Sequence, residues 1–248
     1  MCRAVRAQIS VDKGLVVLEL IREYGIYFLI GQYPDGPLGG LAMTVILAVL
    51  ALLLSLPLGV VLGICQVSPY RALRCAVSAF AGLVRAMPLL LIIFWIYFLL
   101  PLFIGGSPGK FQTVLISLVV FEAIYISVII RAGIKSLPKG QMESARALGF
   151  SYISAMILVV MPQVMKNMLP SLVGEFVSII KLTSLGYVVS LSDVTFVAEQ
   201  INSQVITKPA QVYALLGLTY FLMCFGISRF AYWLERRLSV RSGFAGNR

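Results

Sequence analysis

The sequence predicts an all-α integral membrane protein with about five transmembrane helices. Hydrophobic residues make up 60% of the chain and charged residues only 12%, whereas a soluble domain carries about 25% charged residues. A chain of 248 residues has room for roughly five or six spans of about 20 residues plus their loops. Long apolar segments alternate with turns and basic loops, and this alternation favours five spans.

The N-terminal tail, residues 1–37, is predicted to stay outside the bundle of spans. Residues 14–33 are apolar but contain Glu19, Arg22 and Glu23, and a charge at the centre of a span costs about 2.5 to 3.5 kcal/mol. We therefore expect an interfacial amphipathic helix there. The polar first 13 residues do not have the pattern of a cleavable signal peptide.

The first span is predicted over 41–64, a segment without any charged residue. Small side chains recur in it at every fourth position, at Ala51, Ser55, Gly59 and Gly63. Such a stripe lets two helix backbones approach each other closely. A short basic loop is expected to follow, over 66–76.

The other apolar segments predict four more spans, over 84–103, 112–132, 171–191 and 211–232. Residues 150–165 are too short for a span and contain Pro162, so we expect a separate interfacial or partner-facing helix. A polar loop is expected over 192–210, and a cytoplasmic tail over 239–248.

The distribution of basic residues predicts the orientation of the spans. Lys and Arg gather in the loop at 66–76, between 131 and 166, and after 229, which places these segments in the cytoplasm. The C-terminus is then inside and the N-terminus outside. The same rule accounts for the net charge of +10, so no nucleic-acid partner is expected.

Several kinds of chemistry are missing from the sequence. There is no histidine, and the four cysteines are scattered, at Cys2, Cys65, Cys75 and Cys224. A zinc site or disulfide framework is therefore not expected. The chain lacks the G-x-x-x-x-G-K-[ST] motif that cradles nucleotide phosphates. We expect no metal, no cofactor and no enzymatic activity.

The most informative stretch is the basic loop over 137–162, which is rich in small residues. Glu143-Ser144-Ala145 is followed after three residues by Gly149, and later by Pro162. This spacing resembles the EAA loop of bacterial ABC importer permeases, with Ser144 in place of an alanine. Further segments resemble the polar amino acid permeases in the same order, among them Leu137-Pro138-Lys139-Gly140-Gln141 and Lys181-Leu182-Thr183-Ser184-Leu185.

The resemblance covers residues 38–238 and implies the transmembrane domain of a type I ABC importer. Such a chain is a permease subunit for amino acid uptake in the bacterial inner membrane. It works by alternating access with a second permease subunit, alike or paralogous, two cytoplasmic P-loop ATPases and an external solute-binding protein. ATP is then bound by the partner subunits and not by this chain.

The resemblance also implies which residues couple the permease to its ATPase: Glu143, Ser144, Ala145, Gly149 and Pro162. Small side chains let a short helix enter a groove on a partner, and glycine permits a turn that bulkier residues resist. Glu143 either pairs with a basic residue of that groove or caps its own helix. The pattern departs from the family at Leu182, where an aspartate is frequent.

Two charged residues fall in the middle of predicted spans, Glu122 in the third and Lys181 in the fourth. An ionisable residue inside a membrane indicates a functional site or a structural ion pair. We expect Glu122 and Lys181 either to pair or to line the substrate path, together with Thr183 and Ser184.

Two other classes of protein remain alternatives. An ATP-independent secondary transporter or channel would show inverted repeats, and none is visible. A membrane enzyme would need a catalytic constellation, which the sequence does not offer.

Overall fold

The computed structural model describes residues 21–106, 108–206 and 208–241. Regular structure in this part of the chain is helical, apart from isolated β-bridges such as the one between Gly31 and Leu38. Four helices are long and apolar enough to cross a membrane, or five if one sharply bent pair counts as a single span. The predicted all-α membrane fold is confirmed.

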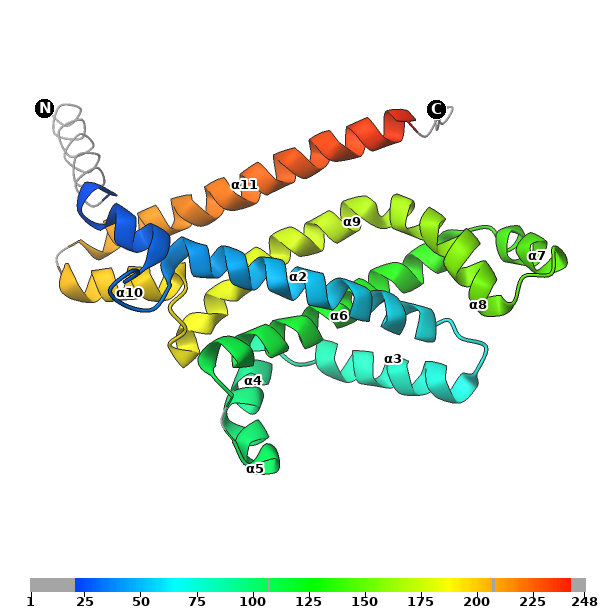
Figure 1. The fold of residues 1–248 in the computed structure, drawn as a ribbon, viewed down its shortest axis with the longest axis horizontal. Coiled ribbons are helices and arrows are strands. Elements are labelled where there is room, and N and C mark those ends of the chain that lie inside the picture. The colour runs from blue at the N-terminus through cyan, green and yellow to red at the C-terminus, as the bar shows by residue number, and fades with distance from the viewer. Residues whose placement is uncertain (1–20, 107, 207, 242–248) are drawn as a thin grey trace, which may run out of the picture.

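Three long helices run along the longest axis of the molecule, α2 (Gly40–Cys65), α6 (Lys110–Ser136) and α9 (Met161–Leu182) (Figure 1). The predicted spans 41–64 and 112–132 lie inside α2 and α6. The most extensive packing joins these two helices. A Cβ placed on Gly59 would lie 2.6 Å from that of Ile126, so the predicted stripe of small residues does bring two backbones close together.

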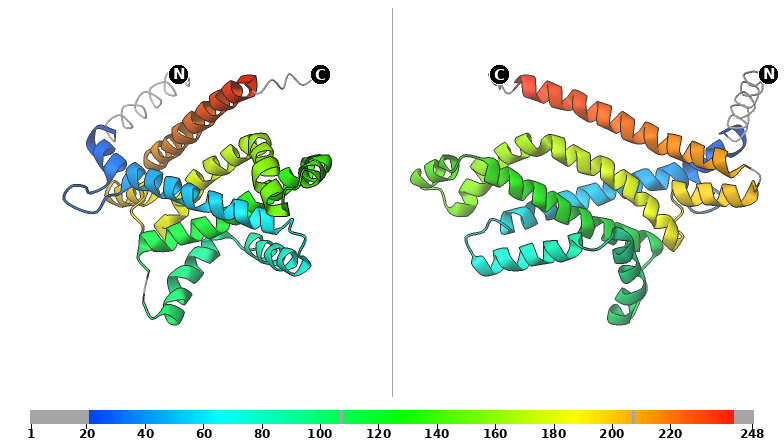
Figure 2. Two further views of the ribbon diagram at one scale, coloured as in Figure 1. Left: turned by 45° about the vertical axis from the view of Figure 1, so that its right-hand side comes forward. Right: turned by 180° about the vertical axis from the view of Figure 1, so that it is seen from behind.

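The predicted second span, 84–103, does not form one helix. Its first residues end the helix α3 (Arg71–Arg85), and after a bend of 100° the rest forms α4 (Leu89–Phe94), the π-helical turn η1 (Trp95–Leu99) and α5 (Leu100–Ile104). Pro88 stands at the bend, and a residue that precedes a proline is disfavoured in the helical conformation. The end of the expected basic loop, from Arg71 on, is the first turn of α3. Figure 2 shows α4 and α5 projecting from the bundle.

Residues 150–165 do not form a separate helix, so that prediction was wrong. One helical stretch runs from Tyr152 to Val189, through α8 (Tyr152–Ala155), the π-helical turn η2 (Met156–Val160), α9 and the 3₁₀ turn η3 (Thr183–Val189). In η2 the Met161 N–H donates to the Met156 carbonyl, five residues back. Pro162 directly follows this π-helical turn, and the altered hydrogen-bond pattern of the turn accommodates a residue without an N–H inside the helical stretch.

The predicted polar loop over 192–210 contains a helix, α10 (Val194–Gln204). Its apolar positions repeat at helical spacing, and four of them are buried, Val194, Val197, Ala198 and Ile201. Residues 21–30 are also helical, and their buried Phe28 packs against α10. The expected amphipathic helix is thus described only in part, because residues 14–20 lie outside the described residues.

The last helix, α11 (Pro209–Arg241), contains the predicted span 211–232 and extends into the expected tail at 239–241. It packs against α9 and α10, yet its apolar stretch is the least buried of the candidate spans. Exposed aromatic and aliphatic side chains cover it, including Phe221, Leu222 and Phe225. In a membrane this surface meets lipid or another apolar helix.

Candidate docking site and membrane path

The resemblance-derived coupling segment forms a short helix at one end of the bundle, α7 (Gly140–Ala147) (Figure 1). Leu137 ends α6, and Lys139 is the N-cap of α7. The chain then reverses at Gly149, whose φ is +90°. The N–H of Phe150 donates to the carbonyl of Ala145 at 3.2 Å and so closes the turn.

The two faces of α7 differ. Ala145 is only 4% exposed, and α7 packs on η2 and α8. Five of the exposed residues in this segment are hereafter called the docking face: Ser144, Ala147, Leu148, Gly149 and Phe150. Leu148 is 79% exposed. Ala145 therefore seats α7 on its own chain, which corrects the expectation that it lies against a partner.

Pro162 lies outside the docking face, in the first turn of α9. Its neighbour Gln163 links the two segments of the motif, because its Nε2 donates to Oε1 of Gln141 on α7 at 3.1 Å. Pro162 itself is exposed. The spacing of the motif thus reflects a shared location at the α7 end of the bundle.

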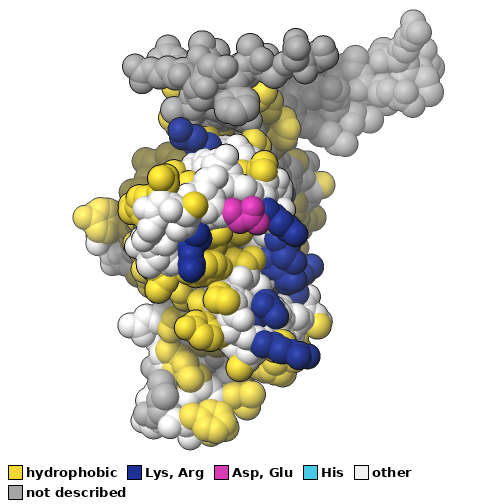
Figure 3. Space-filling model, turned by 90° about the vertical axis from the view of Figure 1, so that its right-hand side faces the viewer, with side chains coloured by type: hydrophobic (Ala, Val, Ile, Leu, Met, Phe, Trp, Pro, Cys, Tyr) yellow, Lys and Arg dark blue, Asp and Glu magenta, His cyan; other side chains and the backbone are white. Residues whose placement is uncertain are grey.

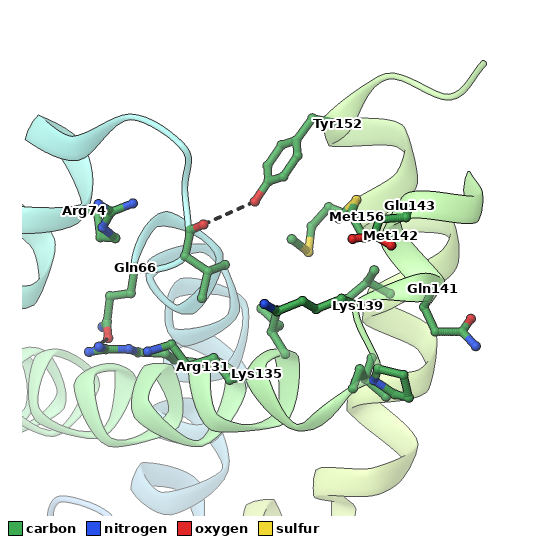
Figure 4. Close-up of a pocket in the computed structure, with 15 residues that line it drawn as sticks. Gln66, Arg74, Arg131, Lys135, Lys139, Gln141, Met142, Glu143, Tyr152 and Met156 are labelled. Atoms are coloured by element: carbon green, nitrogen blue, oxygen red, sulfur yellow. Dashed lines mark hydrogen bonds between the residues drawn. The ribbon is translucent and has the colours of Figure 1, made fainter. Parts of the chain in front are cut away.

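Glu143 is exposed and lines a pocket of about 610 Å³, hereafter the basic pocket. The pocket lies among the end of α6, the turn after α2, α7 and α8, and basic side chains project into it (Figure 4). Figure 3 shows Lys and Arg gathered along one side of this end of the molecule, beside acidic atoms.

The structure does not bring Glu122 and Lys181 together. Glu122 is 1% exposed, on α6, and its carboxyl group interacts with that of Glu175 on α9. Oε2 of Glu122 has no hydrogen-bond partner. Lys181 is exposed, and no ion pair joins it to Glu122 in the described structure.

The polar side chains that follow Lys181 form hydrogen bonds with backbone carbonyl groups. The Thr183 hydroxyl is buried and donates to the carbonyl of Ile180, and the Ser184 hydroxyl donates to that of Lys181. Both bonds satisfy carbonyl groups where α9 gives way to the 3₁₀ turn. Each hydroxyl keeps its acceptor lone pairs while it donates, so both residues remain candidates for the substrate path.

Two buried polar clusters have no counterpart in the sequence interpretation. Buried Gln66 donates through Nε2 to the Ser127 hydroxyl at 2.8 Å and accepts from Nη1 of Arg131 at 3.5 Å. The sequence does contain a signal for this cluster, because the polar residue Gln66 lies just beyond the apolar span at 41–64.

The second cluster lies at the opposite end of the molecule, where Asp193 caps α10 by accepting from the N–H of Phe196 at 2.9 Å. Burial raises the pKa of Asp193 to about 7, although hydrogen bonds from Phe196 and Thr195 act in the other direction. The N–H of Val194 donates to the Thr44 hydroxyl at 3.1 Å. An aspartate directly before a helical apolar pattern is a recognised N-cap signal.

No group of three or more His, Cys, Asp or Glu able to hold a metal ion occurs among the described residues. The carboxyls of Glu122 and Glu175 lie on the long helices α6 and α9, and α7 with the docking face follows directly after α6.

Comparison with known proteins places the chain in a family. Residues 55–240 match the family model described as "Binding-protein-dependent transport system inner membrane component". The inner membrane amino-acid ABC transporter permease protein YhdY of Escherichia coli K12 is 30% identical over 221 residues, which are 88% of this chain and 60% of that relative. The chain thus spans less than two thirds of YhdY.

A relative of similar length and a solved structure agree with this match. The probable glutamine ABC transporter permease protein GlnP of Bacillus subtilis is 34% identical over 204 residues, 82% of this chain and 91% of GlnP. A crystal structure of an amino acid ABC transporter with histidines matches with a TM-score of 0.76 at 30% identity, over 89% of this chain and 98% of that one. The chain belongs to the family of binding-protein-dependent transport system inner membrane components.

Proposed function

We propose that this permease subunit moves amino acids inward across the bacterial inner membrane, driven by ATP hydrolysis on a separate P-loop ATPase. The docking face carries the proposal. A side chain such as Leu148, 79% exposed at the tip of a polar loop, has an apolar surface suited to burial against a partner. The relatives named as amino acid permeases support the choice of substrate.

The assembly is proposed to contain two permease subunits, two ATPases and an external solute-binding protein. The weakly buried α11 offers an apolar surface to lipid or to the second permease. α11 ends at the same end of the molecule as α7, and residues 21–30 lie near α10 at the other end (Figure 1). This arrangement supports a cytoplasmic C-terminus and an external N-terminus.

Coupling follows from the way α7 is attached. It packs on η2 and α8, which continue directly into α9, so movement of a bound ATPase is transmitted to the long helices. The carboxyls of Glu122 and Glu175 lie at the α6–α9 contact and are proposed to meet the substrate ammonium. Exposed Lys181 is proposed to meet its carboxylate, with Thr183 and Ser184 along the path.

Co-purification in mild detergent tests this proposal, with the tagged chain carrying Gly149→Arg or the control Gly105→Arg. Both glycines have a positive φ and no atom within 4 Å of an added Cβ, but Gly105 lies in the turn before α6, away from α7. We expect a P-loop ATPase with the parent and with Gly105→Arg, and its loss with Gly149→Arg. A parent chain that transports alone in liposomes and retains no ATPase would contradict the proposal.

A further inference from the structure

The basic pocket carries an excess of positive charge that the proposed coupling role does not use. Four of its side chains are cationic and come from three elements: Arg74 on α3, Arg131 and Lys135 on α6, and Lys139 at the start of α7. Glu143 is the carboxylate among the lining residues. Four positive charges against one negative charge leave a net charge of +3.

These cations are not neutralised within the described structure, where no ion pair joins any of them to a carboxylate. Like charges that face one cavity repel each other, and the repulsion grows as water is excluded. Figure 4 shows the basic side chains of α3, α6 and α7 directed toward the same space. Such an arrangement is favourable only when an anion or mobile counterions occupy the space between them.

The arginines are held in place before any ligand binds. Arg131 donates to Oε1 of buried Gln66, which Ser127 holds in turn. Nη1 of Arg74 donates to the carbonyl of Ser68 at 3.0 Å. Each contact leaves other guanidinium N–H groups free to donate, since a guanidinium carries five. Preorganised donors bind an anion with little loss of side-chain entropy.

The side of the pocket formed by α7, α8 and η2 carries Tyr152 and two methionines. The Tyr152 hydroxyl donates to the carbonyl of Val67 at 3.3 Å and so ties α8 to the turn after α2. Met142 and Met156 supply an apolar side. The volume of about 610 Å³ falls within the roughly 300 to 1,000 Å³ of small-molecule sites.

We propose that the basic pocket binds a phosphate group, which bridges α7 to α3 and α6. Arginine matches phosphate through paired N–H donors, and lysine adds point charge. The phosphate belongs either to an anionic phospholipid or to a soluble phosphate compound of the cytoplasm. If α7 is the ATPase-docking helix of the proposed function, an occupied pocket holds that helix against the spans and adjusts the coupling.

Binding to the full-length chain in mild detergent tests the site without the ATPase, so its failure is separate from failure of the proposed function. The pocket variant is Lys135→Gln with Lys139→Gln. The control is Lys110→Gln with Lys166→Gln, which removes the same charge at exposed lysines outside the pocket. The probes are inorganic pyrophosphate and phosphatidylglycerol, with phosphatidylcholine as the uncharged reference, and the readout is the rise in Tm with probe concentration.

We expect parent and control to bind with equal affinity and the pocket variant to bind at least about tenfold more weakly, because it loses two charge-assisted contacts with phosphate. A response to phosphatidylglycerol alone identifies a lipid headgroup, and a response to pyrophosphate alone identifies a soluble phosphate compound. No response by the parent, or equal weakening in pocket variant and control, would overturn the proposal.

Discussion

The two ends of the molecule are built in opposite ways. At the closed end, around Gly40, Thr44 and Asp193, most buried polar groups are paired: the Gly40 N–H donates to the carbonyl of Ser192 at 2.9 Å and the Val194 N–H to the Thr44 hydroxyl at 3.1 Å, whereas Oδ2 of Asp193 has no partner. The pocket there has a volume of only about 30 Å³. At the open end, around α7, the surface is exposed and basic, and the pocket is about 610 Å³.

The difference indicates that the closed end stabilises the fold and that the open end is available for binding a partner. Buried polar groups that are paired stabilise one arrangement of the chain, because leaving one unpaired costs about 1–3 kcal/mol. Exposed apolar residues and unpaired cations contribute little to the stability of the isolated chain. Changes at the closed end are therefore expected to act on stability, and changes at the open end on binding.

Two glycines with positive φ give the largest expected contrast. A Cβ at Gly40 (φ +60°) would overlap the carbonyl oxygen of Phe28 and lie 2.9 Å from its carbon, whereas one at Gly149 (φ +90°) would meet no atom within 4 Å. Gly40→Ala is expected to lower the free energy of unfolding by about 3 kcal/mol or more. Gly149→Ala is expected to cost only about 1 kcal/mol, for the left-handed backbone. Denaturant unfolding in detergent measures both, and equal losses would refute the contrast.

Neighbouring residues on α7 sharpen the comparison within the open end. Ala145→Leu forces a larger side chain under α7 and is expected to destabilise the chain by about 1–3 kcal/mol. Ser144→Leu adds the same bulk on the exposed face, so stability should stay unchanged while ATPase recovery falls. Tm and ATPase recovery from the same preparations separate the two effects. If Ser144→Leu lowers the stability as much as Ala145→Leu does, Ser144 does not lie on an exposed face of α7 and the contrast is wrong.

Exposed Lys181, one residue before the end of α9, tests the membrane path. Lys181→Met is expected to lower amino acid uptake by proteoliposomes several-fold while leaving assembly intact, because it removes a charge without emptying a packed site. Lys110→Met, at an exposed lysine at the start of α6, is the control. Uptake at the parental rate for Lys181→Met would exclude this lysine from the path.

A pH effect of Asp193 is the smallest expected change. Its pKa is raised by burial from 3.8 to about 7. Between about pH 4 and pH 7 the folded chain holds a proton that the unfolded chain has released, so stability falls as pH rises through this window. Asp193→Asn keeps the N-cap and should lose less Tm than the parent between pH 5 and pH 8. Identical pH profiles would show that Asp193 titrates normally.

The sequence predicted well where the pattern was long and local. Two charge-free or nearly charge-free runs became α2 and α6, because the bilayer itself demands such lengths. The spacing from Glu143 to Pro162 located the exposed end of the bundle. These features depend on residue spacing and composition, and both can be read from a single sequence.

Predictions failed where tertiary context decided the outcome. Pro162 was interpreted as a sign that residues 150–165 form a separate short helix, but the π-helical turn before Met161 accommodates the proline within a longer helical stretch. Ala145 was assigned to the partner side, since the sequence does not say which face of α7 packs on its own chain. Glu122 was expected either to pair with Lys181 or to line the substrate path with it, and the structure places its carboxyl group beside that of Glu175 and not beside Lys181.

Site-specific photocrosslinking tests the central claim most directly. A photoreactive amino acid replaces Leu148 at the open end or Ile206, which is 81% exposed near α10, in cells that contain the whole transporter. The account predicts an adduct with a P-loop ATPase at position 148 and none at position 206. An ATPase adduct at position 206, or its absence at position 148, would contradict the assignment of the open end as the docking site.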